Sequence, residues 1–430
     1  MSTAEDLGAF IDRSPTPFHA VGAAAELFSA AGFTALDPTE DWGPAAAGAA
    51  FVVRDGSLVA WGPSSAPTGP MRIIGAHTDS PNLRVRPRPD TGAAGWRQVG
   101  VEVYGGALLN SWLDRDLGLA GRVAVRVGGP SGATVEHRAF RTDRPVLRVP
   151  QLAIHLDRGV NEGLALNPQQ HLTPVWGLGD PHEGDVAAWL GSLVGAEAGD
   201  VLAWDAACFD VQASARLGVD EELLAAPRLD NLCSSWGAVA ALAEVANRAE
   251  PPEHVPVAVL YDHEEVGSTT ATGAAGAWLA QVLERRTLAL GGTRSDLLRT
   301  LAGSVLLSAD MAHATHPNYP ERHEPRHRVL AGGGPVIKHN ANARYATDSR
   351  GAALFRLACE AAEVPVQDYS HRGDLPCGST IGPLAAAGLA VDTVDVGMGM
   401  LSMHSARELM AAADVGLQHR AFTAWFSTAP

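Results

Sequence analysis

The stretch Asp262-His263-Glu264-Glu265-Val266-Gly267-Ser268 directly follows an apolar run from Val255 to Tyr261. The apolar run predicts a buried strand, and this strand would end in two adjacent carboxylates. If the segment is extended, the side chains of Glu264 and Glu265 point in different directions. One carboxylate can then hold a metal ion while the other reaches a water on that metal, an arrangement suited to metal-assisted hydrolysis.

Two further predicted strands end in groups that can bind metals. The strand from Met71 to Ala76 precedes His77 and Asp79, and the strand from Val305 to Ser308 precedes Asp310. In an open α/β sheet, ligands bind beyond the carboxyl ends of the strands. If the three strands are parallel neighbours, their ends bring these groups together along one edge of the sheet.

Two more candidate ligands come from loops. Asp230 lies just before the helix expected from Leu232 to Arg248, where a carboxylate is favourably placed, and His404 follows the last predicted strand. Two histidines and three carboxylates, with Glu264 left over, suit a two-metal site of the zinc or cobalt type. One carboxylate would then bridge two ions about 3.5–4 Å apart.

Roles for the remaining groups follow from their spacing. Asp79 lies two residues from His77 on one face of a strand, so it can accept the second N–H of the imidazole ring. Glu264 can take a proton from a water on the metals and later deliver it to a leaving amine. Each group alone also has an ordinary explanation, such as a solvated glutamate pair, a helix-capping aspartate or a core histidine. Their shared placement beyond strands favours a site.

The composition limits the class of protein. The chain has 430 residues with 46% hydrophobic residues, which indicates a globular protein of two or three domains. A net charge of −16 disfavours binding to nucleic acid and to anionic membranes. Four cysteines without a C-x-x-C pair argue against a cysteine-based zinc site. With no signal peptide and no apolar run of about 20 residues, we expect a soluble, cytoplasmic protein.

Helices and strands alternate in the first and last parts of the chain, which predicts an α/β fold with a central, mostly parallel sheet flanked by helices. A hairpin is expected over residues 51–61, with Gly56 in the middle, and most of residues 406–426 are expected to be helical. The middle of the chain is rich in Gly, Pro, Val and Arg and predicts an inserted β-rich domain with a helix from Asp185 to Val194. We therefore expect a discontinuous catalytic domain of residues 1–85 and 222–430 around an inserted domain of residues 86–221.

The motifs around these residues resemble those of the M18 metallopeptidases, the aspartyl aminopeptidase family, over nearly the whole chain. The resemblance includes Ser14-Pro15-Thr16-Pro17-Phe18-His19, Ala76-His77-Thr78-Asp79-Ser80-Pro81, Arg228-Leu229-Asp230-Asn231, His263-Glu264-Glu265-Val266-Gly267-Ser268, Asp310-Met311-Ala312-His313, Pro376-Cys377-Gly378-Ser379-Thr380 and Met403-His404-Ser405. It implies a zinc-peptidase-like catalytic domain and an inserted domain that mediates dimerisation. It also implies homo-oligomers in which dimers assemble into a hollow dodecamer.

The resemblance assigns a role to each candidate ligand. His77 and Asp310 would bind one ion, Glu265 and His404 the other, and Asp230 would bridge them. Glu264 would be the general base, and Asp79 would orient His77.

Two residues are implied to act on the substrate. His155 would reach the active site of a neighbouring subunit and hold the substrate or stabilise the oxyanion; the alternative is a strand histidine of the inserted domain. Lys338 would lie near the substrate, where a cation attracts an acidic side chain or the peptide carbonyl. The alternative for Lys338 is a surface lysine on the loop after Gly332-Gly333-Gly334.

Other polar residues near these motifs are expected to line the site rather than bind metal. His263, His313 and His316 lie close to the candidate ligands in sequence, and His371 precedes the Pro376-Cys377-Gly378 stretch. The chain departs from the family pattern at His371, which leaves the side-chain preference of the enzyme open.

Together these observations predict an aminopeptidase with two divalent metal ions, zinc first, with cobalt or manganese as alternatives. Its substrates would be peptides with a free N-terminus and an aspartate or glutamate in first position. Three alternatives stay open: an aminopeptidase for neutral residues such as leucine, a dinuclear hydrolase of another amide, and an inactive scaffold. The complete set of ligands disfavours the scaffold.

Overall fold

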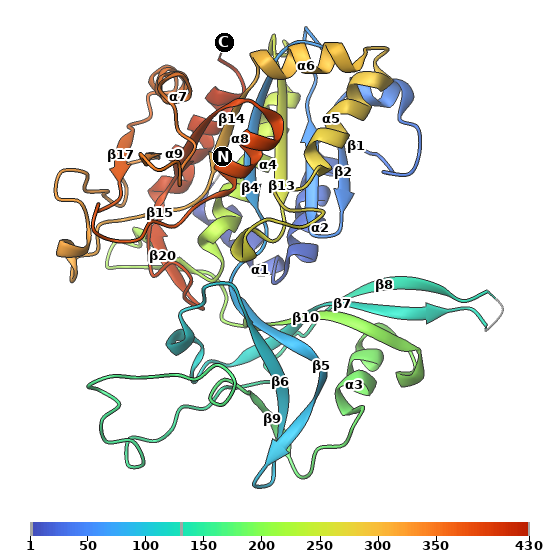
Figure 1. Ribbon diagram of the computed structural model, residues 1–430, viewed down its shortest axis with the longest axis vertical. Coiled ribbons are helices and arrows are strands. Elements are labelled where there is room, and N and C mark those ends of the chain that lie inside the picture. The colour runs from blue at the N-terminus through green and yellow to red at the C-terminus, as the bar shows by residue number, and fades with distance from the viewer. Residues whose placement is uncertain (1–2, 130–131, 429–430) are drawn as a thin grey trace. The chain divides into compact units, whose positions relative to one another are not determined.

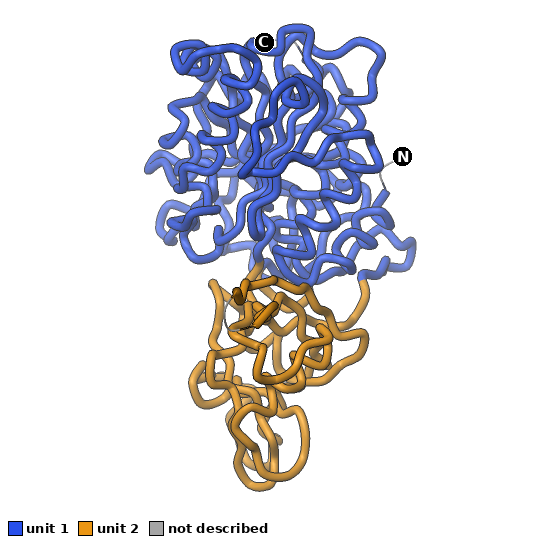
Figure 2. The backbone as a smooth tube through the Cα atoms, turned by 90° about the vertical axis from the view of Figure 1, so that its right-hand side faces the viewer, with its two compact units in different colours: residues 1–79, 214–403, 408–430 blue, residues 80–213, 404–407 orange. Residues whose placement is uncertain are grey.

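A nine-stranded mixed sheet forms the centre of the first of two units, which comprises residues 1–79, 214–403 and 408–430 (Figures 1 and 2). The computed structural model describes residues 3–129 and 132–428 of the chain. In spatial order the strands are β1 (Thr34–Ala35), β2 (Ala50–Arg54), β3 (Ser57–Trp61), β13 (Val255–Tyr261), β4 (Met71–His77), β14 (Val305–Ala309), β18 (Asp392–Gly397), β16 (Val336–His339) and β17 (Gln367–Ser370).

The strands β13, β4, β14 and β18 at the centre of this sheet are parallel to one another. Strands β13, β4 and β14 are buried along their whole length, as expected for near-continuous apolar sequences covered on both faces. The register pairs Tyr261 with His77 and Ser308 with Gly75, so Asp310 falls level with His77 two residues later. The prediction that these three strands are parallel neighbours ending at one edge is confirmed.

Helices cover both faces of the sheet (Figure 1). One core packs residues of α1 (Ala4–Arg13), α2 (Pro17–Ala30), α4 (Leu229–Ala246), α7 (Ser349–Ala361) and α9 (Ala413–Trp425) against one face, and the other packs α5 (Trp278–Ala289), α6 (Arg294–Gly303) and α8 (Ile381–Leu389) against the opposite face. Within β4, Ile74 belongs to the first core and Ile73 to the second, which is the alternation of a pleated strand. The predicted α/β class is confirmed.

The predicted hairpin is formed by β2 and β3, and its turn supports the site edge of the sheet. A side chain on Gly56 would place its Cβ 2.3 Å from Oδ2 of Asp262, the residue that follows β13, so only glycine fits here. The Thr78 hydroxyl donates a hydrogen bond to the Gly56 carbonyl at 2.7 Å. The turn thus joins the segments that follow β13 and β4.

A smaller five-stranded sheet contains the first part of residues 406–426, the segment expected to be mostly helical. It contains β11 (Ala215–Leu217), β12 (Leu223–Ala226), β20 (Glu408–Ala411), β19 (Gly399–Leu401) and β15 (Ala312–His313) in this order. β20 pairs with β12 on one side and β19 on the other, and α9 begins only at Ala413. Pairing with distant strands therefore overrides the helix preference of the Ala-rich sequence.

The second unit comprises residues 80–213 and 404–407 and is built on an antiparallel sheet (Figure 2). Its strands in spatial order are β8 (Thr134–Arg141), β7 (Leu117–Val127), β10 (Val201–Asp210), β5 (Asn82–Ala93), β6 (Trp96–Tyr104) and β9 (Val175–Leu178). The helix α3 (Asp185–Val194) contributes Val186 and Leu190 to the core of this unit. Within the described ranges, no helix has the length and apolar character needed to cross a membrane.

Candidate metal centre

His77 is the last residue of β4 and is only 1% exposed. Its carbonyl accepts a hydrogen bond from the Ser235 hydroxyl of α4 at 2.7 Å, which fixes the end of the strand. Nδ1 of its ring lies 3.0 Å from the backbone carbonyl oxygen of Asp79 and 3.5 Å from the Asp79 carboxylate. The nearer acceptor is thus the backbone carbonyl, and the opposite ring nitrogen, Nε2, is the one that faces the other carboxylates.

The Asp79 carboxylate holds the two glutamates in place. Its oxygens accept hydrogen bonds from the backbone N–H groups of Glu264 at 3.0 Å and Glu265 at 3.1 Å. These residues form a 3₁₀ turn, Glu264–Val266, and the expectation of an extended segment is wrong. The reason is His263, whose left-handed conformation (φ 66°) turns the chain away from the direction of the strand. The backbone N–H groups of the two glutamates then point to Asp79 and donate to its carboxylate.

Asp230 is held at the start of α4 by two distant strands. Its φ and ψ of −81° and 105° are not helical, and its peptide bond to Asn231 is cis. The Asp230 N–H donates to Oε2 of Glu408 on β20 at 3.0 Å. The Asn231 side chain donates to the carbonyl of Ala309, the last residue of β14, at 2.7 Å. Asp230 is therefore fixed next to the segment that carries Asp310.

Asp310 follows β14 and is 6% exposed. Its N–H donates to the carbonyl of Val396 on β18 at 2.9 Å. A side chain on Gly397 would place its Cβ 1.8 Å from the Asp310 carbonyl oxygen, so glycine is required where the two segments approach.

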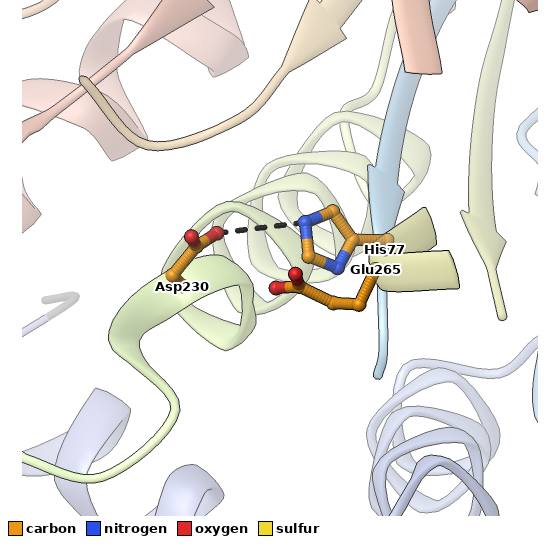
Figure 3. Close-up of side chains that lie close together, drawn as sticks. All are labelled: His77, Asp230 and Glu265. Carbon is orange, nitrogen blue, oxygen red and sulfur yellow. Dashed lines mark ion pairs between the residues drawn. The ribbon is translucent and has the colours of Figure 1, made fainter. Parts of the chain in front are cut away.

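These segments bring one histidine and several carboxylates together. Donor atoms of His77, Asp230 and Glu265 all lie within 4.8 Å of one another, and Figure 3 shows the three side chains converging from the strand end, the start of α4 and the 3₁₀ turn. The His77 Nε2 atom lies 3.5 Å from Asp230, 3.7 Å from Asp310 and 4.0 Å from Glu264. Imidazole and carboxylate donors at this spacing fit a zinc-type ion.

The charges in this cluster also favour a cation. Burial lowers the pKa of His77, but the carboxylates of Asp230, Asp310 and Asp79 outweigh burial and raise this pKa well above its ordinary value. Burial raises the pKa of Glu264 to about 8, His77 opposes this rise, and the neighbouring aspartates add to it. The carboxylates of this buried cluster thus carry more negative charge than the single imidazole can balance. A divalent cation is strongly stabilised in such a cluster.

The remaining two predicted histidines belong to the second unit. His404 lies in the segment 404–407, where Nδ1 is 3.0 Å from the Gly106 carbonyl oxygen. His155 lies in an exposed turn, so the alternative of a strand histidine is wrong. The assignment of His404 as a ligand and of His155 as a substrate residue stays a prediction.

Lys338 lies on β16 and is 2% exposed, so the alternative of a lysine on a surface loop is wrong. Its ammonium donates a hydrogen bond to the carbonyl of Met311, the residue after Asp310, at 3.0 Å. It also lies 5.3 Å from the centre of the Tyr345 ring, within range of a cation–π contact. Desolvation, and after it the charge of Lys338, lower the pKa of the His313 ring, although this residue lies exposed at the end of β15 (Ala312–His313).

Sequence reasoning missed one residue that supports the site. Glu408, which holds Asp230, lies in a segment expected to be mostly helical. For Lys338 the sequence holds a further signal: it is the only lysine of the chain, in which every other basic side chain apart from histidine is arginine. A compact ammonium and a larger, forked guanidinium are not interchangeable, so a single lysine in a chain that otherwise uses arginine is a candidate site residue.

A buried cluster of histidine and carboxylates beyond the strands of an α/β sheet defines a metal-dependent hydrolase. Residues 10–426 match the family described as "Aminopeptidase I zinc metalloprotease (M18)". The chain is 53% identical over 414 residues to the "Probable M18 family aminopeptidase 2" of Streptomyces avermitilis, covering 95% of this chain and 94% of that relative. The chain belongs to the M18 family and is a metallo-aminopeptidase.

Solved structures agree with this assignment. The chain is similar to a structure described as "Cryo-EM structure of the Ape4 and Nbr1 complex", with a TM-score of 0.93 and 36% identity over 98% of this chain and 85% of that one. It is also similar to "Structure of S. cerevesiae mApe1 dodecamer", with a TM-score of 0.85 and 29% identity over 98% of this chain and 96% of that one.

We expect zinc to stabilise the protein through the cluster around Asp230. Asp230→Asn replaces a negatively charged metal-binding carboxylate with a neutral amide, so the amount of zinc bound per chain should fall. The rise in Tm on adding zinc should also become smaller, because a ligand stabilises only the state that binds it. Zinc content by elemental analysis and thermal unfolding with and without zinc measure both. The control is Asp392→Asn, which alters an exposed ion pair with Arg350 and should leave both unchanged. Full zinc binding by Asp230→Asn would contradict this assignment.

Proposed function

We propose that the protein is a dinuclear zinc aminopeptidase that removes acidic residues from the N-termini of peptides. In this proposal His77 and Asp310 hold one ion, Glu265 and His404 hold the other, and Asp230 bridges them. The mutual spacing of the donors of His77, Asp230 and Glu265 supports a shared site for these three residues, and the 3.7 Å between His77 Nε2 and Asp310 supports the inclusion of Asp310. The resemblance of the Met403-His404-Ser405 motif to the family pattern supports the inclusion of His404.

The chain's own residues divide the remaining work. When bound, the two ions would polarise the scissile carbonyl and increase the acidity of a water. Glu264 is the base that takes the proton of this water and returns it to the leaving amine, because its carboxylate is mostly buried and lies 4.0 Å from Nε2 of His77, beside the candidate ligands. Asp79 keeps Glu264 and Glu265 at fixed positions through their backbone N–H groups.

The acidity of Glu264 predicts the pH dependence of the reaction. A base must be deprotonated, so kcat should rise with pH. The midpoint should lie between 4.5, its ordinary value, and about 8, since bound cations favour the charged form. Glu264→Gln should lower kcat by about 100-fold or more while zinc content is kept. The control is Glu360→Gln, which changes an exposed glutamate of α7. A Glu264→Gln enzyme with unchanged kcat would refute the base assignment.

The buried position of the only lysine is the observation that carries the acidic preference. Lys338 extends from β16 to the Met311 carbonyl, beside the candidate ligand Asp310. Burial raises the pKa of Asp395, and the charge of Lys338 is the largest influence against this rise, so the lysine lies within electrostatic reach of a buried carboxyl group. A desolvated ammonium of this kind can hold the carboxylate of an aspartate or glutamate substrate.

Lys338→Met should abolish this preference, since methionine replaces the apolar stem of the lysine side chain almost fully and removes its charge. Loss of one charged hydrogen bond should lower kcat/KM for aspartyl and glutamyl p-nitroanilides by about 10- to 100-fold and change that for leucyl p-nitroanilide little. N-acetylation of the aspartyl substrate should stop turnover by the parent enzyme, whereas a hydrolase of acylated amino acids would accept it. A parent enzyme that prefers leucine over both acidic residues would contradict the proposal.

We further propose that copies of this chain associate and that His155 acts on a neighbouring copy. His155 lies between Ile154 and Leu156, which are 47% and 76% exposed, and Leu152 nearby is 57% exposed. Apolar side chains exposed this far commonly lie in interfaces between subunits. The relative of 29% identity described as a dodecamer supports association of this kind.

Complementation between two inactive variants tests this role of His155. A His155→Ala subunit keeps its own metal centre, and a Glu264→Gln subunit keeps His155. Co-expressed with two different affinity tags and purified through both, mixed assemblies should be clearly more active than either variant alone. If His155 acts within its own chain or has no role, the mixture will show only the average of the two activities.

A further inference from the structure

Tyr369 lies on β17, at the edge of the nine-stranded sheet, in register with Lys338 on β16. Paired residues of neighbouring strands project to the same face, so Tyr369 lies on the side of the sheet that Lys338 faces. Its side chain is 4% exposed and belongs to a small apolar cluster with Tyr345. We refer to Lys338, Tyr345 and His313 together as the wall. Tyr369 is a buried neighbour of this group.

The Tyr369 ring contacts two residues of this wall. Its centre is 6.3 Å from that of His313 and 6.3 Å from that of Tyr345, with interplanar angles of 64° and 62°. Edge-to-face packing at this distance is favourable and depends on orientation. Tyr345 in turn lies against the Lys338 ammonium. A displaced Tyr369 ring would thus move both rings that flank the lysine.

One hydrogen bond holds Tyr369 in this place. Its hydroxyl oxygen and Nδ1 of His371, two residues later, are 2.6 Å apart. Burial lowers the pKa of His371, and the backbone of Pro376 opposes this effect. The His371 ring therefore also interacts with the loop that contains Pro376. Cys377 in that loop packs against the same apolar cluster. His371 therefore connects Tyr369 to the loop of residues 376–378.

We propose that Tyr369, held by His371, is a positioning residue that sets the wall around Lys338 and so tunes which N-terminal residue the enzyme accepts. This inference rests on the proposed role of Lys338. Because the contacts of Tyr369 are with the wall, its influence is on substrate affinity and on the choice between side chains.

The test compares kcat and KM for aspartyl, glutamyl and leucyl p-nitroanilides. Tyr369→Phe and His371→Ala each remove one neutral hydrogen bond and should raise KM for the acidic substrates about 3- to 10-fold, with kcat and zinc content within twofold of the parent. His371→Asn should restore KM to within twofold, because its side-chain amide can lie where Nδ1 of the ring was. The control is His339→Gln, which alters a similar pair with Asp368 (3.1 Å) on the opposite face of the same two strands.

Two results would overturn the inference. In the first, Tyr369→Phe and His371→Ala leave the acidic-to-leucyl ratio of kcat/KM as it is in the parent. In the second, both variants lower kcat equally for all three substrates, which a general loosening of the fold would also do. If the proposed acidic preference is wrong, the parent enzyme itself will show no preference for the aspartyl and glutamyl substrates. A change in the acidic-to-leucyl ratio of kcat/KM between parent and variant still reports on the role of Tyr369. If Tyr369→Phe folds poorly, the comparison of His371→Ala with His371→Asn gives the same readout at a partly exposed position.

Discussion

Buried negative charge is the constraint on which the rest of the site depends. Asp79, Asp230 and Asp310 are all at most 6% exposed and surround a single imidazole. Without a cation, the cluster keeps protons on His77 and Glu264 far above their ordinary pKa values. A divalent ion held by these side chains would supply the same compensation with a larger charge and displace these protons, which would link metal binding, protonation and folding.

Such a cluster also needs a backbone that holds the carboxylates together against their repulsion. Arg228 and His263 adopt left-handed conformations immediately before the segments of Asp230 and Glu264, a conformation that costs free energy for residues other than glycine. Glycine is required at Gly397, where the carbonyl of Asp310 approaches β18. Hydrogen bonds across long sequence separations, such as that from Asp230 to Glu408, fix these conformations. The left-handed residues thus lie close in sequence to the candidate ligands Asp230 and Glu265.

The sequence predicts the part of the site that follows from strand ends. Apolar runs before His77, Glu264 and Asp310 were enough to place these groups at one edge, because buried parallel strands have a simple pattern and ligands lie beyond their carboxyl ends. Two other features depended on contacts that a local pattern does not contain. The 3₁₀ turn of the glutamates requires the Asp79 carboxylate, which is 185 residues away from Glu264. The strand β20, which carries Glu408, requires pairing with β12 and β19.

The candidate metal ligands and the residues proposed to face the substrate side chain lie in different parts of the sheet, a separation that would let one chemistry serve different preferences. His77, Glu265 and Asp310 extend from the central parallel strands, where a displaced backbone would disturb three candidate ligands at once. Lys338 and Tyr369 lie on β16 and β17, at one side of the sheet, beyond the central strand β18. Changes there can reshape the wall while leaving the metal centre intact.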